Sequence, residues 1–89
     1  MSNEKVLDLI KETLKSSINY TERAARDMKK AHFTEGILKD ILLNPREIKE
    51  YGDNNYIVFG RKTAKIRIEV AQDNSLLIHW VEYNKVAVL

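Results

Sequence analysis

The sequence predicts an α+β domain in which two or three N-terminal helices pack on one face of an antiparallel sheet of three or four strands. Apolar residues recur at helical spacing in the first half of the chain, between residues that favour helix caps. Short runs of alternating apolar and polar residues, separated by turn-forming residues, fill much of the second half. The 89 residues correspond to one domain with a small hydrophobic core.

Three helices are expected in the first half of the chain. The first covers about residues 3–15, the second residues 21–32 and the third residues 35–43, each with apolar residues three and four positions apart. Thr21 and Thr34 are suitable N-caps for the second and third helices, because a threonine hydroxyl accepts a hydrogen bond from a free N–H of the first turn. The stretch between the first two helices is expected to be a linker.

Four strands are expected to follow, at about residues 46–51, 56–61, 65–71 and 76–83. If the last hairpin turns at Asp73-Asn74, residues that face each other across the two strands share one face of the sheet. The resulting pairs are Ala71 with Leu76, Glu69 with Ile78, Arg67 with Trp80 and Lys65 with Glu82. The opposite charges of the last pair favour this register.

This register divides the sheet into two faces. The residues expected on the helix-covered face are Ile66, Ile68, Val70, Leu77, His79, Val81 and Tyr83. On the outer face, Leu76, Ile78 and Trp80 form an apolar row beside Arg67, which is typical of a contact surface, so these three are candidate partner-contact residues. The alternative is that the first helix or the apolar tail at residues 86–89 covers this row. A β-bulge would instead shift the register by one residue and place His79 on the outer face.

Composition limits the functional classes. The absence of cysteine excludes disulfides, thiolate catalysis and cysteine-based zinc sites. No apolar run approaches the roughly 18 residues that span a membrane, and the N-terminus lacks the apolar core of a signal peptide, so a cytoplasmic protein is expected. The net charge is +2, with eight Lys/Arg against seven Asp/Glu in residues 1–45 and seven against six in residues 46–89. No strongly basic arm for nucleic acid is therefore present.

The spacing of polar residues matches no standard catalytic or metal-binding motif. His32 and His79 are the only histidines, no HxH or HExxH spacing occurs, and the three glycines form no phosphate-binding loop. No metal and no cofactor are therefore expected. His32 is interpreted as a residue near a helix C-terminus, and His79 as a structural histidine within a strand.

Basic residues gather on the second helix and around the first long hairpin. Together with Tyr51, Tyr56, Trp80 and Tyr83 they form the kind of set that holds phosphates and stacks bases. Dispersed, solvated lysines and arginines are the alternative interpretation. The candidate residues for binding phosphate or nucleic acid are Arg23, Arg26, Lys30, Arg61, Lys65, Arg67, His79 and Tyr83.

Residues 18–83 resemble a known family. The stretches that carry the resemblance are RAARDMKKAHFTEGILKDILLNPREIKEY, YIVFGR, IRIEV and LLIHWVEY, and their best-matching positions include Met28, Asn44-Pro45 and Tyr51. In this order they resemble a widespread prokaryotic domain of unknown function (catalogued as DUF four-two-five-eight), which is similar to BrnT and related to the RelE/ParE toxin superfamily. The resemblance implies a RelE/ParE-like fold and a toxin-antitoxin context, with an antitoxin-like protein, a second copy of the chain or RNA as partners.

The family pattern is incomplete in this chain. Arg61 matches the family's Tyr-x-x-x-Gly-Arg, but Arg23 stands at the family's histidine, Asp27 and Ala31 at two of its arginines, and His32 at its glycine. A ribonuclease of this kind needs cations to hold the scissile phosphate and a group to move protons. The substitutions favour a non-catalytic interaction module that binds a protein partner, itself or nucleic acid, and a toxin-like ribonuclease is the alternative.

Overall fold

The computed structural model describes residues 3–14, 17–60, 64–73 and 75–83 of the chain. Its elements are α1 (Asn3–Leu14), β1 (Ile18–Tyr20), α2 (Glu22–Lys30), α3 (Glu35–Leu43), β2 (Glu47–Gly52), β3 (Asn55–Phe59), β4 (Lys65–Val70) and β5 (Leu76–Glu82). The expected α+β class and the three helices are confirmed. The tail at residues 86–89, which was expected to dock or pair, lies outside the described residues.

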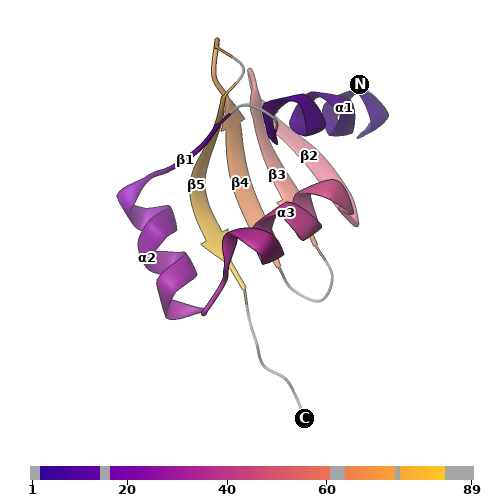
Figure 1. Cartoon of the computed structure of the whole chain (residues 1–89). Helices are drawn as coiled ribbons and strands as arrows, with labels where there is room; N and C mark the ends of the chain where they lie inside the picture. Colours follow the sequence, from indigo (N-terminus) through magenta and orange to yellow (C-terminus); the bar gives the residue numbers. More distant parts are fainter. Residues whose placement is uncertain (1–2, 15–16, 61–63, 74, 84–89) are drawn as a thin grey trace.

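The sheet has five strands in the order β1-β5-β4-β3-β2, and β1 runs parallel to β5 whereas the other neighbours are antiparallel (Figure 1). The expectation of a purely antiparallel sheet of three or four strands is therefore wrong at this edge. The expected linker contains β1, in which Ile18 pairs with Leu76 and Tyr20 with Ile78. Three residues are too few for an alternation of apolar and polar side chains to be recognised in the sequence.

The two expected helix caps are confirmed, and one of them also docks its helix on the sheet. Thr21 Oγ1 accepts from the Ala24 N–H at 3.0 Å, and Thr34 Oγ1 accepts from the Ile37 N–H at 3.2 Å. The Thr21 hydroxyl in turn donates to the His79 carbonyl at 2.7 Å. The start of α2 therefore continues the pairing along the edge of β5 where β1 ends, which protects an otherwise open strand edge.

All three helices bury apolar side chains against the same face of the sheet (Figure 1). The strands contribute Ile48, Tyr56, Val58, Ile66, Ile68, Val70, Leu76, Ile78 and Val81 to this core. Gly60 follows β3 directly beneath α3, where an added Cβ would stand 2.7 Å from Cγ2 of Ile41. Only glycine therefore fits there without a shift of the Ile41 side chain.

A β-bulge interrupts the pairing of β4 with β5. Arg67 pairs with Trp80 as expected, but the next residue, Ile68, pairs with Ile78, so that His79 is the extra residue. A shift of one residue moves the following side chains to the other face, because side chains alternate along a strand. The sequence raised this bulge as an alternative, and the structure contains it.

The bulge reverses the expected faces of the first half of β5. Leu76 and Ile78 were expected on the outer face, but both are fully buried beneath the helices. Leu77 and His79 were expected in the core, but both are partly exposed. The expected apolar contact row is therefore wrong, and Trp80 is the member of the three that lies partly exposed opposite Arg67.

A hydrogen bond joins β1 to α3, and it predicts how stability depends on pH. The Tyr20 hydroxyl donates to Glu35 Oε1 at 2.6 Å. Burial and this carboxylate raise the pKa of the Tyr20 phenol above its ordinary 10.0, and the same bond lowers the pKa of Glu35 below its ordinary 4.5. Both shifts stabilise the folded state at neutral pH.

Tyr20→Phe is expected to lower Tm at neutral pH and to flatten its dependence on pH. The contribution of the raised phenol pKa is complete below pH 10.0 and is lost above it, whereas that of the lowered carboxyl pKa is complete above pH 4.5 and is lost as pH falls below it. Thermal unfolding of both proteins between about pH 3 and 11 measures the difference. Parallel curves for the two proteins would contradict the assignment.

Candidate nucleic-acid interface

The helices leave one face of the sheet uncovered, and we call it the open face. Its side chains come from β2 to β5, and they alternate along each strand with the buried residues of the core. The open face consists of Glu47, Lys49, Tyr51, Asn55, Ile57, Phe59, Lys65, Arg67, Glu69, Leu77, His79, Trp80 and Glu82. It therefore combines positive, negative and aromatic side chains.

One row of the open face runs straight across four strands. Strand pairing places Lys49 beside Ile57, Ile57 beside Arg67, and Arg67 beside Trp80. The row ends at α2, where the guanidinium of Arg23 lies 5.9 Å from the centre of the Trp80 ring. Three cations, the indole of Trp80 and the side chain of Ile57 thus form one row.

A second aromatic ring, Phe59, lies in the neighbouring row and is surrounded by cations. Lys49 Nζ is 5.7 Å from the ring centre, Lys65 Nζ 5.8 Å, and the Arg46 guanidinium 5.9 Å. Each such cation–π contact at an exposed site contributes about 0.5–1 kcal/mol. Lys65 also forms the expected ion pair with Glu82, at 3.9 Å.

Arg67 occupies the middle of the open face. Its guanidinium lies 4.9 Å from the ring centre of Tyr51, and that ring is 61% exposed. The Nε of Arg67 is buried and has no hydrogen-bond partner among the described residues. A buried donor without a partner is costly, and the contact with the Tyr51 ring is the interaction that holds this guanidinium.

The bulge brings a histidine to the open face. His79 Nε2 lies 2.7 Å from Glu69 Oε1, and both side chains are partly exposed. A carboxylate that holds one ring nitrogen fixes the orientation of the imidazole. The pair is therefore arranged to accept or donate a proton on the same strands that carry Arg67 and Trp80.

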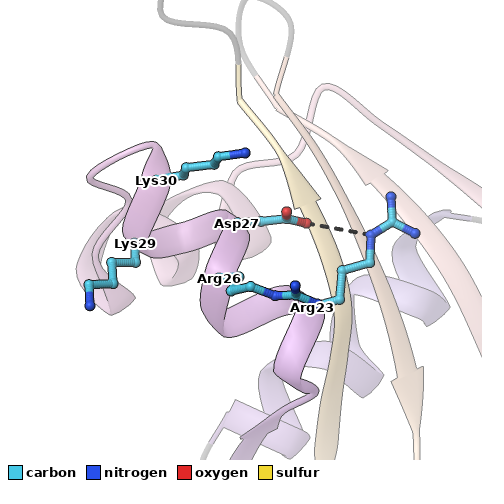
Figure 2. Close-up of a pocket in the computed structure, with 5 residues that line it drawn as sticks. All are labelled: Arg23, Arg26, Asp27, Lys29 and Lys30. Atoms are coloured by element: carbon cyan, nitrogen blue, oxygen red, sulfur yellow. Dashed lines mark ion pairs between the residues drawn. The ribbon is translucent and has the colours of Figure 1, made fainter.

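The basic side chains of α2 form a rim beside the open face. Figure 2 shows Arg23, Asp27 and Lys30 on the side of α2 that faces β5, and Lys29 on the opposite side. The Asp27 carboxylate forms an ion pair with the Arg23 Nε at 3.8 Å and accepts a hydrogen bond from the Val81 N–H at 3.3 Å. It therefore joins the Arg23 side chain to the backbone of β5. A shallow depression of about 520 Å³ is lined by Arg23, Arg26, Asp27, Lys29 and Lys30.

The structure brings part of the predicted binding set together. Arg23, Lys65, Arg67 and His79 lie on the open face or at its edge, whereas Arg26 and Lys30 belong to α2. Arg61 lies outside the described residues.

Two of the tyrosines that were expected to stack bases pack against other residues of the chain instead. Tyr83 packs edge-on against Phe33, with ring centres 5.2 Å apart, and Tyr56 is only 3% exposed. The expectation that Tyr56 stacks bases is therefore wrong, because the alternation along β3 turns its ring into the core. The same alternation turns Phe59 outward, but the four apolar residues of YIVF do not show in the sequence which of them face outward.

Two further features, a metal-binding cluster and a membrane-spanning helix, are not found in the described part of the chain. Within residues 3–14, 17–60, 64–73 and 75–83, no three His, Asp or Glu side chains gather in a way that could hold a metal ion. Among the same residues, no helix is long and apolar enough to cross a membrane.

Comparison of the chain with protein-family models, with curated proteins and with solved structures finds no match. The resemblance to the RelE/ParE superfamily therefore stays a prediction.

Proposed function

We propose that this chain is a non-catalytic interaction module that binds single-stranded nucleic acid on the open face. One observation carries the proposal: Tyr51, Phe59 and Trp80 lie on the uncovered side of the sheet, each with an arginine or lysine over its ring. Bases stack on exposed aromatic rings and on guanidinium planes, and cations between the rings hold phosphates. RNA is the substrate class that the family resemblance implies.

The charge of the open face favours a single strand over a duplex. The chain has a net charge of only +2, and Glu47, Glu69 and Glu82 stand among the cations, so long-range attraction to a phosphate backbone is weak. Affinity must then come largely from stacking, which requires unpaired bases. If about four cations each replace one counterion, the logarithm of affinity falls with the logarithm of salt with a slope near −3.

We extend the proposal to the scaffold and propose that it is RelE/ParE-like, which the order of helices followed by antiparallel strands supports. His32, at the position of the family's glycine, has a φ of 54°, and glycine adopts this left-handed conformation most readily. The backbone of His32 thus adopts the conformation that the family's glycine favours, and this supports the resemblance. An antitoxin-like partner remains a prediction of the resemblance.

One observation favours a toxin-like ribonuclease as the second candidate. The pair of His79 and Glu69, at 2.7 Å, lies close to Arg67, so an imidazole base and a cation for the phosphate are both present. In such a reaction His79 would take the proton of a ribose 2′-hydroxyl as its oxygen bonds to the adjacent phosphorus. The bond from phosphorus to the 5′-oxygen would break, and this leaving oxygen would take up a proton from water, which leaves a 2′,3′-cyclic phosphate. We favour binding without cleavage, because Arg23, Asp27 and Ala31 replace the histidine and two arginines of the family pattern.

A single experiment distinguishes the two candidates. Labelled single-stranded RNA, single-stranded DNA and duplex RNA of about 12 nucleotides, within the usual range of site sizes, are titrated with the protein by fluorescence anisotropy and then resolved on a gel. We expect single strands to bind and to stay intact, and Arg67→Ala to lower affinity about tenfold through the loss of a charge-assisted hydrogen bond. Lys11→Ala, in the exposed last turn of α1, is the control and should bind as the wild type does.

Two results would decide against the favoured proposal. Cleavage that is abolished by His79→Ala and by Arg67→Ala, together with growth arrest on expression, would establish the ribonuclease instead. A failure of every single strand to bind at low salt, or equal affinity for duplex and single strand, would contradict recognition by stacking.

A further inference from the structure

Among the described residues the sheet ends at β2, and none of their strands lies beside its outer edge. Successive residues of an antiparallel strand direct their N–H and C=O groups alternately toward the strands on either side. The N–H of Gly60, which directly follows β3, donates to the carbonyl of Ala64, which directly precedes β4. The even-numbered residues of β3 therefore direct their backbone groups toward β4. The odd-numbered positions of β3 therefore bond to β2, where their partners are Glu47 and Lys49. The N–H and C=O of Ile48, between these two residues, point away from the sheet and are a template for a further strand.

The charges along this edge are complementary to themselves. Residues 46–50 read Arg-Glu-Ile-Lys-Glu. If a second copy of β2 pairs in the antiparallel direction about a two-fold axis at Ile48, Glu47 faces Lys49 of the copy. This pair occurs twice, so opposite charges meet on both sides of the central Ile48–Ile48 pair. Facing residues of opposite charge stabilise a strand pair, whereas like charges destabilise it.

The same charges select one register. An axis one residue further along would place Lys49 against its own copy and Ile48 against Glu50, which loses the complementarity. Charged side chains, prolines and bulges on an edge strand oppose pairing with another chain unless the facing charges are complementary. The bulge of β2 lies between Glu50 and Gly52, beyond the residues from Glu47 to Lys49 that would pair.

An apolar hollow beside β2 supplies surface for the contact. It measures about 290 Å³ and is lined by Leu7, Leu43, Asn44, Pro45, Arg46, Glu47 and Ile48. Leu43 is 40% exposed, although it is a large apolar side chain. A two-fold axis at Ile48 brings each hollow against the other copy, where burial of Leu43 would add a hydrophobic contribution.

We propose that β2 is the interface of a homodimer in which two sheets join edge to edge through antiparallel β2–β2 pairing centred on Ile48. The axis is perpendicular to the sheet, so both open faces lie on the same side of one continuous sheet. The proposal rests on β2 and its charges, and it is independent of nucleic-acid binding.

The test is the mass of the full chain in solution, measured without nucleic acid by sedimentation equilibrium over a range of concentrations. The wild type should form a dimer of two 10.4-kDa chains. Glu47→Lys or Lys49→Glu alone should raise the dissociation constant at least about tenfold, because each converts two attractive pairs into two repulsive ones. The double variant Glu47→Lys/Lys49→Glu should recover dimerisation, and an equimolar mixture of the two single variants should form heterodimers.

Matched controls carry the same charge changes at the opposite edge of the sheet. Glu22→Lys and Lys29→Glu lie on exposed positions of α2 and should dimerise as the wild type does. Circular dichroism of each variant confirms that it is folded. A wild type that stays monomeric up to about 1 mM overturns the proposal, since even a dissociation constant near 100 µM would populate the dimer there. Folded single variants that dimerise normally, or a folded double variant that stays monomeric, overturn it equally.

Discussion

Ile78→Ala is expected to lower the free energy of unfolding by about 2–5 kcal/mol, the usual cost of removing a large aliphatic side chain from a core. Ile78 is fully buried in β5, between β1 and β4 and beneath the helices. Leu77→Ala, one position earlier, is the matched control and should cost about 1 kcal/mol or less, because Leu77 is partly exposed on the open face. Urea unfolding followed by circular dichroism measures both values.

The comparison of these two variants tests the bulge at His79 directly. In an uninterrupted strand the alternation would bury Leu77 and expose Ile78, so the order of the two effects would be reversed. A larger loss of stability for Leu77→Ala than for Ile78→Ala would therefore contradict the observed register. In an uninterrupted strand, His79 would also lie on the other face from Glu69, so the pair of His79 and Glu69 would be absent from the open face.

Trp80→Ala is expected to weaken binding of single-stranded RNA about 5- to 150-fold, which corresponds to the roughly 1–3 kcal/mol that stacking of one base contributes. Phe59→Ala should have an effect in the same range, because its ring lies on the same face among three cations. Anisotropy titrations at a fixed salt concentration measure the change.

Two variants control for the loss of an aromatic ring and for general destabilisation. Trp80→Phe keeps a ring for stacking and should retain most of the affinity. Tyr20→Phe changes a residue that bonds to Glu35, away from the open face, and should bind as the wild type does. Wild-type affinity in folded Trp80→Ala protein would show that bases do not stack at this position.

The features that follow from neighbouring residues could be predicted from the sequence. Thr21 and Thr34 cap the second and third helices as expected, because a cap requires only the first turn that follows it. The pairs Arg67–Trp80 and Lys65–Glu82 are also confirmed. They lie on the side of the bulge where alternation continues without interruption.

The features that depend on distant parts of the chain could not be predicted in the same way. β1 exists because Ile18 and Tyr20 find partners in β5, more than fifty positions later, and its three residues carry too little pattern of their own. The bulge at His79 depends on how two strands fit together over the helices. Arg67 meets Tyr51 only because β3 lies between their strands and the side chains are long enough to cross it.

The residues of the candidate site also divide into those that the sequence identified and those that it did not. The sequence identified Arg67, Trp80 and Arg23 by residue type, and the structure places them in one row. It did not identify Phe59 or Glu69, since their roles follow from the strands that lie beside them. Residue type in the sequence therefore indicated which kinds of side chain the surface carries. Strand pairing determined which of these residues lie together on the open face.

The most direct test of the account follows the fluorescence of Trp80, which is the only tryptophan of the chain. Its indole lies on the open face, so a base that stacks there should quench the emission. We expect saturable quenching by single-stranded RNA with the same affinity that anisotropy gives, weakening as salt is raised. Binding detected by anisotropy without any change in Trp80 emission would contradict the central claim that the open face is the nucleic-acid interface, as would a complete absence of binding.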